Sequence, residues 1–288
     1  AGTMGGGITM NFANAGIPVT VVEQDAKLLQ KGLLIIQNNY EATVAKGRLS
    51  QEKMDERMAL ITGSTTLDNL ADADIVIEAI YEEMPAKKEL FGRLNQCVKS
   101  TAVLTSNTSY LDVNEIADSI PERKGYVLGT HFFSPANVMR LLEVVRTDSV
   151  DKAVLMSVLD LGRRMGKLPI VSGVCHGFIG NRMLEGYFGE AAIMVEEGAA
   201  PEHIDRVMYE FGMAMGPLAV SDLAGLDIGW AKRKAAGNGV ATDIPGSFVP
   251  NRLCEMGRYG QKTNRGYYSV SYTHLRAHET DSYLVCRL

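Results

Sequence analysis

Long apolar segments are missing from this sequence. A membrane-spanning helix needs about 18 or more consecutive apolar residues, and no run in the chain is that long. Basic residues are also in short supply, since 29 Lys and Arg stand against 34 Asp and Glu and give a formal net charge of -5. Proteins whose main partner is DNA or RNA normally carry a basic excess. The composition therefore excludes a membrane-spanning protein and argues against a nucleic-acid partner.

Cysteine is scarce as well. The four cysteines form no CxxC pair and lie far apart, at positions 97, 175, 254 and 286. This spacing predicts neither a disulfide framework nor a zinc site, and it fits a reducing, intracellular setting. His176 adjoins Cys175, but no third ligand is in view, so a structural histidine is the better interpretation. We therefore expect no metal.

The chain of 288 residues, 46% of them hydrophobic, is long enough for two globular domains. Short apolar runs predict strands at 19–22, 75–77, 102–104, 127–129, 142–145 and 168–171. Helical spacing of apolar residues predicts a helical hairpin over 26–58, broken at Gly47, and a helix over 85–98. Strands that alternate with helices predict a doubly wound, largely parallel α/β sheet of the Rossmann type.

The second part of the chain has a different pattern. Helical spacing covers 177–197, 201–211 and 220–235, with almost no strand signal between these segments. We therefore expect an all-helical C-terminal domain whose boundary with the sheet domain lies near Gly173. The predicted domains are residues 1–173 and residues 174–270.

A glycine turn opens the chain. Gly2-Thr3-Met4-Gly5 leads into a helix-like stretch and the strand at 19–22, and Glu23 ends that strand 21 residues after Gly2. Glycine-rich turns are common, but this interval to an acidic residue is typical of dinucleotide-binding fingerprints. A carboxylate there accepts a ribose 2′-hydroxyl and repels a 2′-phosphate, so NAD is favoured over NADP. The first glycine and strand of such a fingerprint would precede Ala1, so we expect a fragment in which the strands at 19–22 and 75–77 have unpaired edges.

Polar side chains follow several predicted strands, at the carboxyl ends where open α/β sheets bind ligands. Ser106-Asn107-Thr108-Ser109 is one such cluster, although it is equally suited to cap a helix that begins near Asp112. His131 is another, with Glu143 in the next strand 12 residues further on. On spacing alone, a structural histidine is slightly favoured over a catalytic base. Asn181 fits the polar face of a helix as well as it fits a binding site.

Five motifs follow one another along the chain: Gly2-Thr3-Met4-Gly5, Ser106-Asn107-Thr108-Ser109, His131-Phe132-Phe133-Ser134-Pro135, Leu142-Glu143-Val144-Val145 and Gly177-Phe178-Ile179-Gly180-Asn181-Arg182. In this order they resemble the L-3-hydroxyacyl-CoA dehydrogenases of fatty-acid β-oxidation. Two further phrases, 138–143 and 220–227, resemble most the dehydrogenase part of the bifunctional enoyl-CoA hydratase/3-hydroxyacyl-CoA dehydrogenases. The resemblance covers the chain from Ala1 to about Val270.

The resemblance implies an NAD-dependent enzyme that oxidises L-3-hydroxyacyl-CoA to 3-ketoacyl-CoA. It assigns His131 as the general base for the 3-hydroxyl proton and Glu143 as the residue that orients and stabilises the imidazolium, a suitable pair near neutral pH. It places Ser109 and Asn181 against oxygen atoms of the substrate. By the same resemblance the cofactor contacts the turn residues Gly2, Thr3, Met4 and Gly5 together with Glu23, Glu82, Lys87 and Asn107.

The resemblance also implies partners and a location. Bifunctional members carry a hydratase domain before this region and a further helical domain after it, so we expect either such a covalent continuation or a homodimer. The location would be cytoplasmic in a bacterium and peroxisomal or mitochondrial in a eukaryote. Residues 271–288 match nothing in the family, and we predict that they are a non-native tail.

Two other interpretations stay open. The β-hydroxyacid dehydrogenases share the Thr-Met-Gly turn, but they need a Lys one helical turn before their Asn, where this chain has Gly177. The other interpretation is a non-catalytic NAD-binding or structural protein, since one fold hosts many functions. The presence of both His131 and Glu143 weighs against it.

Overall fold

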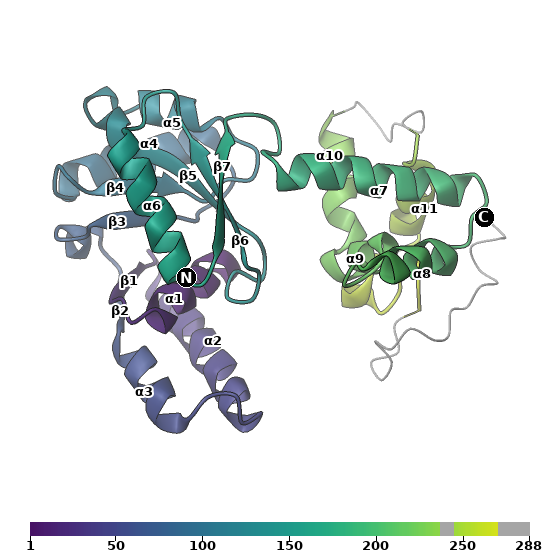
Figure 1. Ribbon diagram of the computed structural model, residues 1–288, viewed down its shortest axis with the longest axis horizontal. Helices are drawn as coiled ribbons and strands as arrows, with labels where there is room; N and C mark the ends of the chain where they lie inside the picture. The colour runs from purple at the N-terminus through teal and green to yellow at the C-terminus, as the bar shows by residue number, and fades with distance from the viewer. Residues whose placement is uncertain (237–244, 270–288) are drawn as a thin grey trace. The chain divides into compact units, whose positions relative to one another are not determined.

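The computed structural model describes residues 1–236 and 245–269. The chain separates into two compact units, Ala1–Asn181 and a second unit that begins at Arg182 (Figure 1). The domain boundary near Gly173 stays a prediction. The predicted non-native tail lies outside the described residues.

The first unit alternates strands with helices, as the sequence predicts. Its elements are α1 (Thr3–Asn14), β1 (Val19–Val22), α2 (Ala26–Ala45), α3 (Gln51–Ala59), β2 (Ile61–Ser64), β3 (Ile75–Glu78), α4 (Met84–Cys97), β4 (Val103–Ser106), α5 (Val113–Asp118), β5 (Val127–Phe132), β6 (Leu141–Arg146), α6 (Lys152–Arg164) and β7 (Leu168–Gly173). The sequence patterns do not predict β2 or α6. The β2 segment has a single large apolar residue, Ile61, so it carries no apolar run by which to recognise a strand.

The strands form two sheets. β1 pairs in parallel with β2, and the larger sheet has the order β3-β4-β5-β6-β7. Its neighbours are parallel except for β5 and β6, which are antiparallel. Among the described residues, β1 pairs with β2 and β3 pairs with β4, and the unpaired edges of β1 and β3 stay a prediction for the chain as a whole.

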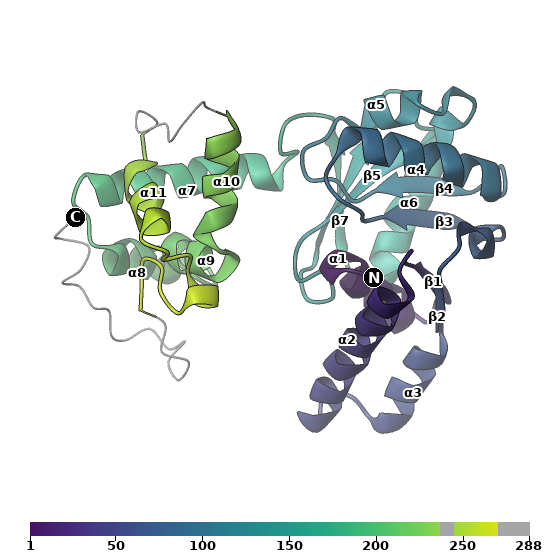
Figure 2. The same cartoon turned by 180° about the vertical axis from the view of Figure 1, so that it is seen from behind.

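Helices cover both faces of the larger sheet (Figures 1 and 2). α1 and α6 pack on one face around a core that includes Phe12, Leu128 and Val158. On the other face, α4 and α5 pack around a second core with Phe91 and Val127. Val127 and Leu128 are neighbours on β5 yet enter opposite cores, because side chains alternate between the two faces of a strand. The doubly wound Rossmann-type architecture is therefore confirmed.

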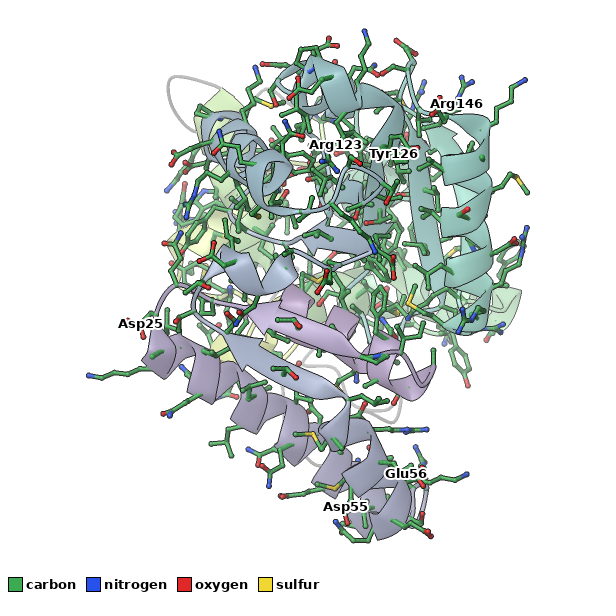
Figure 3. The ribbon with its side chains drawn as sticks, turned by 90° about the vertical axis from the view of Figure 1, so that its left-hand side faces the viewer. Asp25, Asp55, Glu56, Arg123, Tyr126 and Arg146 are labelled. Atoms are coloured by element: carbon green, nitrogen blue, oxygen red, sulfur yellow. The ribbon has the colours of Figure 1, made fainter. Side chains whose placement is uncertain are left out.

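Side-chain caps start both helices of the predicted hairpin. The Asp25 carboxylate, labelled in Figure 3, accepts the backbone N–H groups of Lys27 at 2.7 Å and Leu28 at 3.0 Å at the start of α2. The Ser50 hydroxyl accepts the N–H of Lys53 at 3.2 Å at the start of α3. Each cap satisfies donors that the first helical turn leaves free. The helical hairpin is confirmed, with a break between α2 and α3.

The second unit is helical in its described part. Its elements are α7 (Gly180–Glu196), which begins in the first unit, α8 (Pro201–Phe211), α9 (Pro217–Ala224), α10 (Leu226–Ala236) and α11 (Phe248–Glu255). The sequence predicts one helix over 220–235, but the structure has two, because Gly225 between them adopts a φ of 103°. Among the helices described in both units, none has the length and apolarity to cross a bilayer.

Asp222 is a buried carboxyl group in the helical unit. Its side chain is 4% exposed and accepts the N–H groups of Tyr267 at 2.8 Å and Tyr268 at 2.9 Å. Burial raises the pKa of Asp222 to about 6, although these hydrogen bonds oppose the shift. A carboxyl whose pKa is higher in the folded than in the unfolded protein stabilises the fold below its unfolded pKa, and that contribution is lost as the pH rises through the folded pKa.

We therefore expect the effect of Asp222→Asn on the free energy of unfolding to depend on pH, because the variant removes the titrating group. The wild type should lose up to about 3 kcal/mol relative to this variant between pH 4 and pH 7. The measurement is urea unfolding followed by the fluorescence of Trp230, the single tryptophan of the chain, which packs on the core of this unit. A free-energy difference that stays constant over this pH range would contradict the role of Asp222.

Candidate active site

His131 and Glu143 lie side by side on antiparallel strands. They are paired partners in the register of β5 and β6, and His131 Nδ1 lies 2.7 Å from Glu143 Oε2. Both side chains are buried, with exposed fractions of 4% for His131 and 0% for Glu143. Because partners in an antiparallel pair point to the same face, the register alone brings the two side chains together. The candidate pair predicted from the sequence is thus in contact.

The second oxygen of Glu143 is held by backbone groups at the start of α7. Glu143 Oε1 accepts the N–H groups of Ile179 at 3.0 Å and Gly180 at 2.6 Å. The preceding residue, Phe178, has a φ of 48°, an uncommon conformation for an aromatic residue, in the turn that presents these two amides. Burial alone would raise the pKa of Glu143, but the hydrogen bonds from His131 and from the two amides hold the pKa below its usual value. Glu143 is therefore a carboxylate at neutral pH.

The geometry fixes the proton on the imidazole. A carboxylate only accepts hydrogen bonds, so Nδ1 of His131 carries the proton and donates it toward Glu143, which leaves Nε2 as the basic nitrogen. The rings of Phe133 and Phe178 flank the imidazole, with centroids 4.5 Å and 5.8 Å from that of His131. A Cβ at Gly180 would lie 2.6 Å from the Phe133 ring, so glycine permits this close packing.

The glycine turn presents a helix N-terminus to open space. α1 begins at Thr3, and the first bond of the helical type runs from the Gly6 N–H to the Gly2 carbonyl at 2.8 Å, which leaves the preceding amides available to an anion. A Cβ built on Gly2 or Gly5 would meet no atom within 4 Å. Glu23 Oε2 lies 3.0 Å from the backbone nitrogen of Ala1, directly before the turn. The structure thus brings Glu23 to the turn, and this arrangement fits a dinucleotide cofactor.

The loop after β4 holds further predicted site residues. Asn107 Oδ1 accepts the N–H of Phe132 at 2.9 Å, next to His131 on β5. Glu82 Oε1 accepts the backbone N–H of Ser109 at 2.8 Å and the hydroxyl of Thr108 at 2.5 Å. Burial alone would raise the pKa of Glu82, but these hydrogen bonds and the charge of Lys87 hold it below its usual value. Glu82 therefore orders the loop that carries Ser109.

Lys87 lies in a buried ion pair that no pattern in the sequence predicts. Its Nζ is 2.8 Å from both carboxylate oxygens of Glu78 and 3.5 Å from Glu82, and its side chain is fully buried. Glu78 also accepts the Ser106 hydroxyl at 2.6 Å and the Ile80 N–H at 2.6 Å. A carboxylate at the end of an apolar strand was the available signal for Glu78. The cofactor contact of Lys87 stays a prediction, since its partners here are protein carboxylates.

Other residues singled out in the sequence are less closely connected to the pair His131 and Glu143. Asn181 follows Gly180 in the first turn of α7, yet no hydrogen bond in the described part of the chain joins its side chain, or that of Ser109, to His131. The ring centroids of His176 and Tyr110 lie 5.2 Å apart. His203 is exposed on α8. Among the described residues, no group of three His, Cys, Asp or Glu could hold a metal ion.

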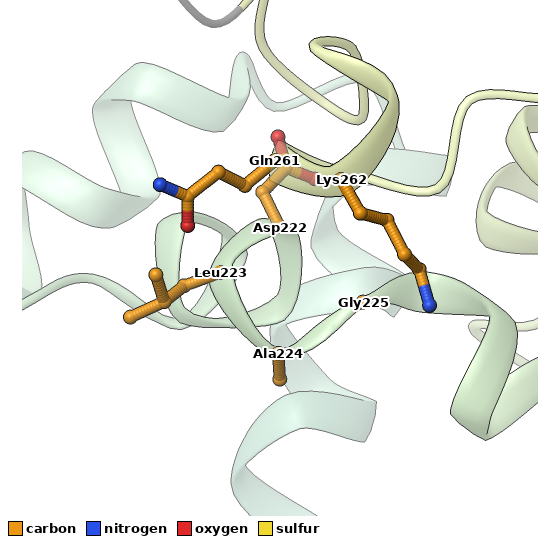
Figure 4. Close-up of a pocket in the computed structure, with 6 residues that line it drawn as sticks. All are labelled: Asp222, Leu223, Ala224, Gly225, Gln261 and Lys262. Atoms are coloured by element: carbon orange, nitrogen blue, oxygen red, sulfur yellow. The ribbon is translucent and has the colours of Figure 1, made fainter. Parts of the chain in front are cut away.

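A pocket in the helical unit lies away from these residues in the sequence. It is lined by Asp222, Leu223, Ala224, Gly225, Gln261 and Lys262 (Figure 4). Lys262 forms an ion pair with Asp227 at the start of α10. None of the residues predicted to act in catalysis or cofactor binding lines this pocket.

Comparison with protein families covers both units. The model of the 3-hydroxyacyl-CoA dehydrogenase NAD-binding domain matches residues 1–175, and the model of the C-terminal domain of the same family matches residues 177–270. The chain belongs to the 3-hydroxyacyl-CoA dehydrogenase family. The match to the NAD-binding domain of this family confirms the cofactor predicted from the sequence.

Similar proteins include longer enzymes. The human peroxisomal bifunctional enzyme is 42% identical over 98% of this chain and 40% of its own length. The peroxisomal fatty acid beta-oxidation multifunctional protein MFP2 of Arabidopsis thaliana is 36% identical over 93% of this chain and 37% of its own length. This chain therefore spans about two fifths of these relatives.

Two solved structures match over nearly their whole length. The FadB2 structure of M. tuberculosis has 34% identity and a TM-score of 0.83, and covers 94% of this chain and 96% of its own. The (S)-3-hydroxybutyryl-CoA dehydrogenase of Ralstonia eutropha has 32% identity and a TM-score of 0.83 with the same coverage. Both agree with a Rossmann-type domain followed by a helical domain.

Proposed function

We propose that this chain oxidises L-3-hydroxyacyl-CoA to 3-ketoacyl-CoA with NAD as the hydride acceptor. The observation that carries the proposal is the contact between His131 Nδ1 and Glu143 Oε2 at 2.7 Å, in a family of NAD-dependent dehydrogenases. Oxidation of a secondary alcohol removes one hydride and one proton. The pair provides a base for the proton, and NAD, when bound, accepts the hydride.

His131 removes the proton of the substrate's 3-hydroxyl group. Nε2 is its unprotonated nitrogen, because Nδ1–H donates to Glu143. Proton transfer creates an imidazolium. The carboxylate of Glu143 is already in place beside the ring, so its charge stabilises the imidazolium without any rearrangement. The amides of Ile179 and Gly180 fix the carboxylate in this orientation through its other oxygen. Glu143 therefore orients the imidazole and stabilises its charged form.

The remaining predicted residues bind and position. Ser109, in the loop that Glu82 orders, and Asn181, in the first turn of α7, hydrogen-bond oxygen atoms of the substrate in this proposal. The amides at the start of α1 would hold the pyrophosphate of NAD, and Glu23 would accept a hydrogen bond from its ribose hydroxyl. Asn107 would lie near the nicotinamide, since its side chain accepts a hydrogen bond from the backbone next to His131.

We place the reaction in fatty-acid β-oxidation, the process named for the Arabidopsis relative. Because the bifunctional relatives are longer than this chain, we propose that it acts as the dehydrogenase part of a larger protein, or as a homodimer. Two of the named relatives are peroxisomal, so the peroxisome is the proposed location in a eukaryotic cell.

The test of this function is the oxidation of NADH by acetoacetyl-CoA, followed by the loss of absorbance of NADH. We expect turnover with this substrate and little with the free acid acetoacetate. A folded protein that binds NADH but turns over no 3-ketoacyl-CoA of any chain length would favour the non-catalytic NAD-binding interpretation instead.

A further inference from the structure

The strands that carry the catalytic pair are joined by the loop 133–140. β5 ends at Phe132 and β6 begins at Leu141, so this loop closes the hairpin in which His131 and Glu143 are partners. Several residues of the loop are exposed at the surface, among them Ser134, Pro135, Val138, Met139 and Arg140. Ala136, by contrast, is buried, with an exposed fraction of 1%. The loop is therefore held from its inner side, at Ala136.

A buried lysine makes that contact. Lys167 precedes β7 and is 6% exposed, and its Nζ donates to the carbonyl oxygens of Ala136 at 2.6 Å and Met139 at 2.8 Å. Burial lowers the pKa of Lys167. Among the described residues, no carboxylate forms an ion pair with it. Burial of an ammonium group without an anion is unfavourable in free energy. The two charge-assisted hydrogen bonds to the loop offset this cost for Lys167.

The same loop is fastened to the cofactor helix. The Asn11 side chain, on α1, donates to the Ala136 carbonyl at 2.9 Å, so this oxygen accepts from both Asn11 and Lys167. A Cβ at Gly7 of α1 would lie 3.0 Å from the Ala136 Cβ and 3.2 Å from the Asn137 nitrogen. The helix that begins at the glycine turn therefore packs directly against the loop that follows His131.

We propose that Lys167 is a positioning residue for His131. By clamping the carbonyls of Ala136 and Met139, it holds the loop 133–140 against α1 and so fixes the imidazole relative to the cofactor that α1 binds. This inference rests on the proposed dehydrogenase function and adds a residue that touches neither substrate nor cofactor. Misplacement of a reacting group by about 1 Å can cost roughly 10²-fold in rate.

The main test compares Lys167→Met with Lys167→Arg. Methionine keeps most of the volume but donates no hydrogen bond, whereas arginine can still donate to two carbonyls. We expect Lys167→Met to lower kcat per NADH-binding site by roughly 10-fold to 10²-fold, with the KM for acetoacetyl-CoA and the Kd for NADH within about threefold of the wild type. Lys167→Arg should recover most of the lost kcat.

Arg123→Met is the matched control. Arg123, labelled in Figure 3, is also buried and donates to the carbonyls of Lys99 at 2.8 Å and Ala102 at 3.1 Å, near the other end of the sheet strands. The Arg123→Met variant should be less stable than the wild type, but its kcat per NADH-binding site should be unchanged. Should Lys167→Met fail to fold, Asn11→Ala removes the second donor to Ala136 and should lower kcat in the same direction.

A second measurement needs no turnover. Hydrogen exchange of peptides that cover residues 131–143 should be faster in Lys167→Met than in the wild type, and unchanged there in Arg123→Met. Unchanged exchange would disprove the clamp itself, and faster exchange with an unchanged kcat would disprove the positioning role. A folded wild type that binds NADH without turnover would instead remove the proposed function, and the positioning role with it.

Discussion

Replacing His131 with glutamine should lower turnover on the order of 10²-fold to 10⁴-fold, because the variant has no basic nitrogen to take the 3-hydroxyl proton. Glutamine still donates a hydrogen bond and has a comparable length, so the contact with Glu143 and the packing between Phe133 and Phe178 are largely kept. The measurement is kcat for the oxidation of NADH by acetoacetyl-CoA. The Kd for NADH should change little, since the proposed role of His131 is in the chemical step.

His203→Gln makes the same substitution at an exposed position on α8 and serves as the control. It should leave turnover unchanged. Near-normal turnover in His131→Gln would remove this residue from the mechanism. The buried contact with Glu143 would then be a structural one, which is the alternative that spacing in the sequence slightly favours.

Replacing Lys87 with methionine should reduce the free energy of unfolding by about 3 to 5 kcal/mol. The variant removes the ammonium from a fully buried ion pair and leaves the carboxylate of Glu78 without its main countercharge. Urea unfolding followed by circular dichroism measures the loss. Most of this loss in the free energy of unfolding comes from the buried charge of Glu78, which has lost its partner. The loss therefore reports on Glu78 as much as on Lys87.

The neighbouring Lys88 offers a matched control. It pairs with Glu115 at the surface, where the two side chains are 36% and 52% exposed, so Lys88→Met should cost less than about 1 kcal/mol. The double variant Lys87→Met/Glu78→Gln should recover a large part of the loss, because glutamine carries no charge and can still accept from Ser106 or Ile80. A loss in the double variant as large as in Lys87→Met would contradict the unpaired carboxylate as its cause.

Local patterns in the sequence predict much of the first unit. Apolar runs locate β1, β3, β4, β5, β6 and β7, and a glycine turn followed by a carboxylate locates the cofactor helix. They do not give the direction of β6. The predicted strands at 127–129 and 142–145 leave enough chain between them for either direction, whereas the longer β5 and β6 leave only 133–140, too short for a parallel crossover. The end of a strand depends on its neighbours, which is why this detail needed the structure.

The sequence by itself determined most of the element types, the cofactor turn, the family and the candidates His131 and Glu143, because each depends on residues close together or on motifs in order. Only the tertiary structure decided which polar groups are buried and what they meet. Lys87 meets Glu78, and Lys167 meets the carbonyl of Ala136, 31 residues earlier in the chain. Lysine and glutamate are normally exposed, so no local pattern predicts their burial. Their environment is created only when distant strands and helices pack together.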